Sequence, residues 1–217
     1  MNRSAAQQAT HVLRRELALE RAGRESLVAV GPFVLASVLL LGLGANARTD
    51  LLRPLSPTLV WLLVLSAALP LARGVRAVEE DEDCWDTLRC VVTPGALLAG
   101  KVAALWLQLA AAWAFAAVLA AAALGARWSA GGVVAGAVGT FGVAVDVTLF
   151  GLLIGSSRRR AGLLGVLVLP AALPALLAGT QAASPGVHAL PWLALLLVFD
   201  LVATALAWAL LPVLLEE

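Results

Sequence analysis

Long uninterrupted apolar blocks are the feature that most constrains the fold of this sequence. An apolar helix of about 20 residues crosses the roughly 30 Å hydrocarbon core of a bilayer, because each residue adds about 1.5 Å. Only 13% of the residues are charged, about half the share in soluble domains. We therefore predict an all-α integral membrane protein in which residues 1–217 form a single transmembrane domain. Its six predicted transmembrane helices cover residues 27–44, 57–72, 102–124, 131–155, 161–183 and 191–215. The second is the shortest, and we expect it to be extended by flanking residues.

The distribution of Lys and Arg predicts the orientation of the chain. With the N-terminus inside, the inner segments contain twelve of the fifteen basic residues, and the outer segments contain only Arg48, Arg53 and Arg127. Cytoplasmic loops of membrane proteins carry an excess of Lys and Arg. Both termini are therefore predicted to be cytoplasmic. The charged segment before the first block is too long for a signal peptide, so this block is predicted to be a retained membrane span.

The N-terminal segment, residues 5–24, is rich in helix formers and lacks Pro. It predicts a helix that lies along the inner membrane interface with its Arg side chains near anionic headgroups. The alternative is a soluble segment that leads into the first span.

An acidic segment in the longest inner loop is a candidate docking element. Acidic residues there depart from the positive-inside pattern, so a role other than topology is favoured. They could bind a basic groove of a cytoplasmic partner, or they could form a solvated charged face. The segment's candidate residues are Glu79, Glu80, Asp81, Glu82, Asp83, Asp86 and Leu88. After it, residues 93–95 are expected to break the helix, and Lys101 is expected at the membrane surface where the third span starts.

Gln108, Asp146 and Asp200 lie inside the predicted third, fourth and sixth spans. An ionised carboxylate at that depth costs about 2.5–3.5 kcal/mol on insertion scales. No Lys or Arg lies at matching depth, so each carboxyl is expected to be protonated, to face water, or to accept hydrogen bonds from neighbouring helices. A transport or proton role and a purely structural role both stay open.

Two prolines, Pro170 and Pro174, lie in the fifth predicted span. Each lacks an N–H and clashes with the carbonyl four residues earlier. A kink near the middle of the membrane is therefore predicted. It could border a cavity or a moving part, or it could only fit the neighbouring helices.

The sequence contains no recognisable catalytic or metal-binding motif. Cys84 and Cys90 form neither CxxC nor CxxCH, and His11 and His188 are far apart. Axial heme ligation by His188 is conceivable. No Walker A motif occurs, so nucleotide hydrolysis is expected on another chain. The chain is therefore predicted not to be an enzyme and to hold no metal. Its net charge of +1 also predicts that it does not bind nucleic acid.

The order of these features resembles the CcmB family, the heme exporter protein B permeases of the cytochrome c maturation system. The start at Arg15–Glu16–Leu17 is similar to the family's Arg-Glu-Leu, and residues 51–57 resemble its approach to the second span. Residues 155–179 are the most specific stretch, because the basic turn at residues 158–160 precedes two prolines at the family's spacing. Residues 84–86 depart from the family's Gly-Ser-Leu-Glu, and the two intramembrane aspartates match no family pattern.

The resemblance implies a type-2 ABC exporter-like permease subunit in the bacterial cytoplasmic (inner) membrane. The implied partners are a cytoplasmic ABC ATPase that binds ATP, heme-handling membrane subunits and a second copy of the chain. Heme is implied as a ligand that the complex transports or handles, and ATP hydrolysis is expected to release a heme-loaded chaperone. The acidic segment is then the expected ATPase-coupling helix. A general type-2 exporter of lipid or drug and a non-transporting membrane scaffold are the alternatives.

Overall fold

The computed structural model describes residues 4–23, 25–45, 48–81, 92–154 and 161–216, and the regular structure in these residues is entirely α-helical. The helices are α1 (Ala5–Gly23), α2 (Glu25–Gly44), α3 (Thr49–Asp81), α5 (Pro94–Leu124), α6 (Ala130–Ile154), α7 (Ala161–Ala171), α8 (Leu173–Ala183) and α9 (Ala189–Glu216).

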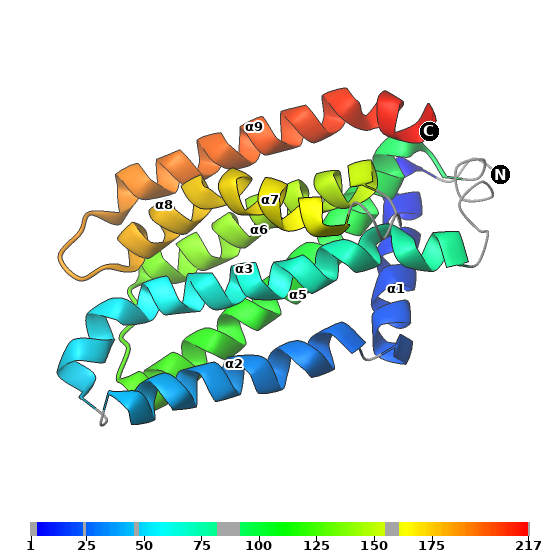
Figure 1. Ribbon diagram of the computed structural model, residues 1–217. Helices are drawn as coiled ribbons and strands as arrows, with labels where there is room; N and C mark the ends of the chain where they lie inside the picture. Colours follow the sequence, from blue (N-terminus) through cyan, green and yellow to red (C-terminus); the bar gives the residue numbers. More distant parts are fainter. Residues whose placement is uncertain (1–3, 24, 46–47, 82–91, 155–160, 217) are drawn as a thin grey trace.

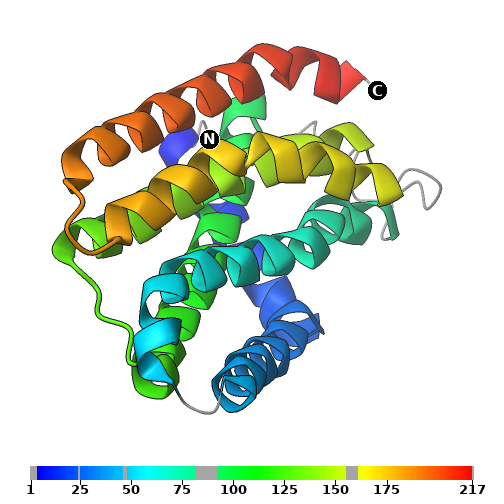
Figure 2. The ribbon, with the colours of Figure 1, turned by 60° about the vertical axis from the view of Figure 1, so that its left-hand side comes forward.

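The long helices form a bundle with two distinct ends (Figure 1). Helix α1 crosses the bundle at the end where α3 finishes, α5 starts and both chain termini lie. The α5–α6 and α8–α9 connections lie at the opposite end. Two views agree that α2 and α9 are on opposite edges, with α3, α5, α6 and the α7–α8 pair between them (Figure 2). Consecutive long helices thus run between the two ends of the bundle in opposite directions, as the predicted topology requires. The side of the membrane on which each end lies stays a prediction.

Four helices are long and apolar enough to cross a membrane: Thr49–Ala72 of α3, Pro94–Leu124, Ala130–Leu153 and Ala189–Leu211. The bent pair Gly165–Ala171 and Leu173–Ala183 forms a fifth candidate span, and Val30–Gly44 is a shorter apolar helix. All six predicted blocks are thus helical over their described residues, apart from the turn at Ala172 between α7 and α8. Four or five of them pass as spans within the part of the chain that the structure describes, so six crossings stay a prediction.

Two helix starts differ from the predicted blocks. Helix α3 begins at Thr49, which confirms that the short second span is extended by its flanks. Helix α5 begins at Pro94, eight residues before the predicted third span. The expectation that residues 93–95 break the helix was therefore wrong for Pro94 and Gly95, which are helical. Of the three, only Thr93 is extended. Pro94 can begin the helix because a proline in the first helical turn loses no hydrogen bond and has its φ angle already set.

Trp61 of α3 occupies the centre of the core, and its side chain is 1% exposed. Its ring packs against Gly139 of α6 and Gly179 of α8, where an added Cβ would overlap the indole. Lipid tails are as apolar as core side chains, so membrane helices associate through close packing at small residues. These two glycines therefore let α6 and α8 approach α3.

We expect Gly179→Ala to destabilise the bundle by about 1–3 kcal/mol, the usual cost of overpacking a core. Gly165→Ala is the matched control in α7, because its Cβ would meet only Leu69 at an ordinary 3.9 Å. The unfolding midpoint in detergent measures both. Equal midpoints for the two variants would contradict the packing described around Trp61.

Candidate functional site

A buried ion pair joins α1 to α5. The Nζ atom of Lys101 lies 3.0 Å from Oε1 of Glu16, and the two side chains are 3% and 18% exposed. Helix α1 covers Lys101, whereas the expected position of Lys101 at the membrane surface stays a prediction. A buried ammonium group is costly unless it is paired. Glu16 supplies this pairing and thereby helps to fix α1 on the bundle.

The backbones of α1 and α5 approach closely beside this ion pair. A Cβ at Gly100 would lie 2.6 Å from Cγ1 of Val12 and 2.9 Å from the carbonyl oxygen of Ala9. Any side chain at residue 100 would therefore push α1 away. One turn from the start of α1, Oε1 of Gln8 accepts hydrogen bonds from the backbone N–H and the hydroxyl of Thr93, at 3.0 and 2.9 Å. We call this set of contacts the α1–α5 clamp.

The clamp borders the predicted coupling segment. The backbone of Glu79, Glu80 and Asp81 forms the last residues of α3, whereas Glu82, Asp83, Asp86 and Leu88 lie outside the described residues. Thr93, which binds Gln8, follows this gap by two residues. The described flanks of the acidic segment thus lie at the same end of the bundle as α1 (Figure 1). The basic turn at residues 158–160 also lies outside the described residues, and its role stays a prediction.

The two intramembrane aspartates belong to one helix interface. Asp146 of α6 and Asp200 of α9 are 6% and 8% exposed, and the two helices that carry them pack against each other. Gly142, one turn before Asp146, makes room for Asp200, since a Cβ there would overlap Oδ1 of Asp200. Oδ2 of Asp146 and Oδ1 of Asp200 have no hydrogen-bond partner among the described residues. No described residue of a neighbouring helix donates a hydrogen bond to these two atoms, but the backbone of Gly142 in α6 faces the Asp200 carboxyl, so the three expectations for the carboxyls stay open.

The sequence placed the two aspartates inside spans but did not predict their proximity, because residue spacing does not reveal which helix faces meet. Gln108, the polar residue singled out in the predicted third span, is buried on α5. No hydrogen bond joins its amide to either carboxyl within the described parts of the chain. Those parts also contain no group of three His, Cys, Asp or Glu side chains that could hold a metal ion.

The predicted proline kink is confirmed. Helix α7 ends at Ala171, α8 begins at Leu173, and the two axes differ by 43°. Pro170 and Pro174 flank the break, and each removes one N–H from the helical hydrogen-bond ladder. Backbone bonds on either side persist, from Ala172 N–H to the Val168 carbonyl and from Leu176 N–H to the Ala172 carbonyl. The bent pair therefore stays one continuous, kinked segment.

We expect Lys101→Met to release α1 from α5. Removing one partner of a buried ion pair costs about 3–5 kcal/mol, and the partial exposure of Glu16 places the expected cost near the low end. Hydrogen–deuterium exchange over residues 5–23 measures the release. Arg14→Gln, an exposed change on the same helix, is the control. Protection of α1 that is unchanged in Lys101→Met would rule out the clamp.

Asp146→Asn and Asp200→Asn are expected to insert and fold with unfolding midpoints at or above that of the wild type. The amide keeps the shape of the side chain but avoids the insertion cost of a carboxylate, about 2.5–3.5 kcal/mol. Asp50→Asn, an exposed change near the start of α3, serves as the control. A lowered midpoint specific to the two buried positions would show that the carboxyl groups stabilise the fold.

The comparisons with known proteins give one family. No curated protein matches the chain. The family model described as CcmB protein matches residues 7–213, which is nearly the whole chain and includes the clamp, both aspartates and the kinked pair. The resemblance found in the sequence is thereby confirmed, and the chain belongs to the CcmB family.

Proposed function

We propose that this chain is the permease subunit of an ABC-type complex that handles heme during cytochrome c maturation. The match to the CcmB family over residues 7–213 carries the proposal, because this is a family of heme-exporter permeases. The apolar helices support a multi-pass membrane subunit. No Walker A motif occurs in the sequence, so ATP is hydrolysed on a separate ATPase chain.

The α1 end of the bundle is where such an ATPase would act. The acidic segment from Glu79 to Leu88 would bind a basic groove of the ATPase. Because α5 begins just after this segment and is fixed to α1 by the clamp, a displacement of the segment would move α1 and α5 together. The force would pass along α5, whose 31 residues span about 45 Å at about 1.5 Å per residue.

The far end of the bundle would then respond to ATP hydrolysis. There the motion would release a heme-loaded chaperone from a neighbouring heme-handling subunit. The ATPase can shift the permease between two conformations only if it contacts them with different affinities. The α7–α8 kink, where the helical ladder is already interrupted, is the place at which the bundle would bend at least cost.

Reversing the charges of the acidic segment tests this proposal. We expect replacement of Glu79, Glu80, Asp81, Glu82, Asp83 and Asp86 by Lys to abolish co-purification of the ATPase, because like charges would then face each other at the interface. The permease should stay in the membrane, since the clamp and the spans are unchanged.

The control reverses Glu216 and Glu217, acidic residues predicted on the same side but outside the segment. ATPase that still co-purifies after reversal of the segment, at the level of this control, would reject the segment as the docking element. A chain that never associates with an ATPase in its native membrane would reject the permease role itself and favour the scaffold alternative.

A further inference from the structure

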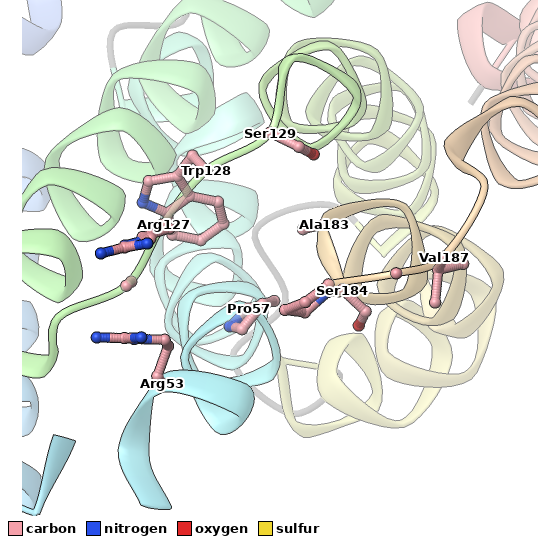
Figure 3. Close-up of a pocket in the computed structure, with 11 residues that line it drawn as sticks. Arg53, Pro57, Arg127, Trp128, Ser129, Ala183, Ser184 and Val187 are labelled. Carbon is pink, nitrogen blue, oxygen red and sulfur yellow. The ribbon is translucent and has the colours of Figure 1, made fainter. Parts of the chain in front are cut away.

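A pocket of about 450 Å³ lies at the end of the bundle opposite α1. It is enclosed by the start of α3, the α5–α6 connection and the α8–α9 connection (Figure 3). The charged and polar side chains among its lining residues are Arg53, Arg127, Trp128, Ser129 and Ser184. No acidic residue lines it, so the pocket is cationic.

The two arginines have no anionic partner in the part of the chain that the structure describes. Arg53 and Arg127 extend to the same side of the pocket (Figure 3). Nε of Arg53 donates a 3.0 Å hydrogen bond to the carbonyl oxygen of Gly125, which fixes the side chain. Among the described residues neither guanidinium forms an ion pair, and this includes Asp50, which lies one turn before Arg53. Two like charges in one pocket repel each other unless an anion lies between them.

The wall beside the arginines is fixed before any ligand binds. Nε1 of Trp128 donates to the carbonyl oxygen of Ala117 at 3.0 Å, and its ring packs edge-on against Trp113 with centroids 5.4 Å apart. Oγ of Ser129 accepts the N–H of Gly132 at 3.0 Å, which leaves the hydroxyl hydrogen available as a donor. The pocket therefore presents two guanidinium groups on one side, with the hydroxyls of Ser129 and Ser184 on the other (Figure 3), and guanidinium groups fit phosphate oxygens well.

The position of the pocket selects the source of that anion. Its walls come from the first turns of α3, the end of α8 and the two connections that join α5 to α6 and α8 to α9, so the pocket lies where candidate spans begin and end. Span ends lie at the boundary between hydrocarbon and water, where phospholipid headgroups are found. Large apolar side chains close in sequence to the lining residues are exposed on α3 and α9: Leu51, Leu55 and Leu190. They offer a surface for acyl chains, which a free phosphate ion would not use.

The outer segments, on the side of the membrane away from the cytoplasm in the predicted topology, give an independent argument. They contain only three of the fifteen basic residues, and two of the three line this one pocket. The geometry points to a site for the phosphate of an anionic phospholipid, with its acyl chains along the exposed faces of α3 and α9. The site does not depend on the proposed heme function.

Native mass spectrometry of the purified full chain tests the site with phosphatidylglycerol, phosphatidylcholine and glycerol 3-phosphate as probes. We expect phosphatidylglycerol to bind most tightly, because the choline group of phosphatidylcholine would be repelled by the second arginine. The double variant Arg53→Gln/Arg127→Gln should bind phosphatidylglycerol about ten- to hundredfold more weakly, as loss of charge-assisted hydrogen bonds predicts.

Two controls keep the result interpretable. Arg48→Gln makes the same charge change at the same end of the bundle but outside the pocket, and it should bind as the wild type does. The single variant Arg127→Gln removes no hydrogen bond or ion pair among the described residues, so it should weaken phosphatidylglycerol binding while the unfolding midpoint stays that of the wild type. Equal weakening by Arg48→Gln, or unchanged binding by the double variant, would overturn the site. Binding of glycerol 3-phosphate as tight as that of the lipid would overturn its assignment to a phospholipid.

Discussion

The hydrocarbon interior of a bilayer offers no water to bond backbone N–H and C=O groups, and this constraint governs the structure. The helical backbone of the candidate spans bonds most of its own N–H and C=O groups, and the prolines of the bent α7–α8 pair interrupt this ladder. Hydroxyl groups in the spans do the same, as shown by Ser56, Thr140 and Thr148, which donate to the carbonyl four residues earlier. With the polar groups satisfied locally, helix association depends on close packing. Gly139 and Gly179 around Trp61 meet this need by admitting a large ring between three helices.

The polar groups that are not satisfied locally mark the places where the chain does more than span a membrane. At one end, Lys101 finds its anion on a helix that crosses the bundle. In the interior, Asp146 and Asp200 occupy one interface and leave two oxygen atoms without partners. At the other end, Arg53 and Arg127 share a pocket that contains no carboxylate. These three positions therefore divide the bundle into a proposed ATPase-binding end, an interior with two acidic residues and a proposed phospholipid-binding end.

The helical class and the positions of the apolar helices could be predicted from the sequence, because the length and polarity of an apolar block act locally, whereas six crossings stay a prediction. The kink was predictable for the same reason, since Pro170 and Pro174 act on their own helix. Contacts between distant segments were not predictable. Nothing at Lys101 indicates that its partner is Glu16, and the proximity of Asp146 to Asp200 depends on how α6 and α9 rotate against each other. The role of Pro94 was misjudged because a proline can either interrupt a helix or begin one. Here Thr93 is the extended residue before the helix, so Pro94 begins α5.

The clamp also has a consequence for the order in which the chain is assembled. Glu16 is made 85 residues before Lys101, so α1 leaves the ribosome long before its binding surface on α5 exists. Until α5 is synthesised and inserted, the first helix has no Gly100 groove to enter and no buried ammonium group to neutralise. Its final placement is therefore a late event that closes one end of the bundle only after the first part of the membrane domain has been built.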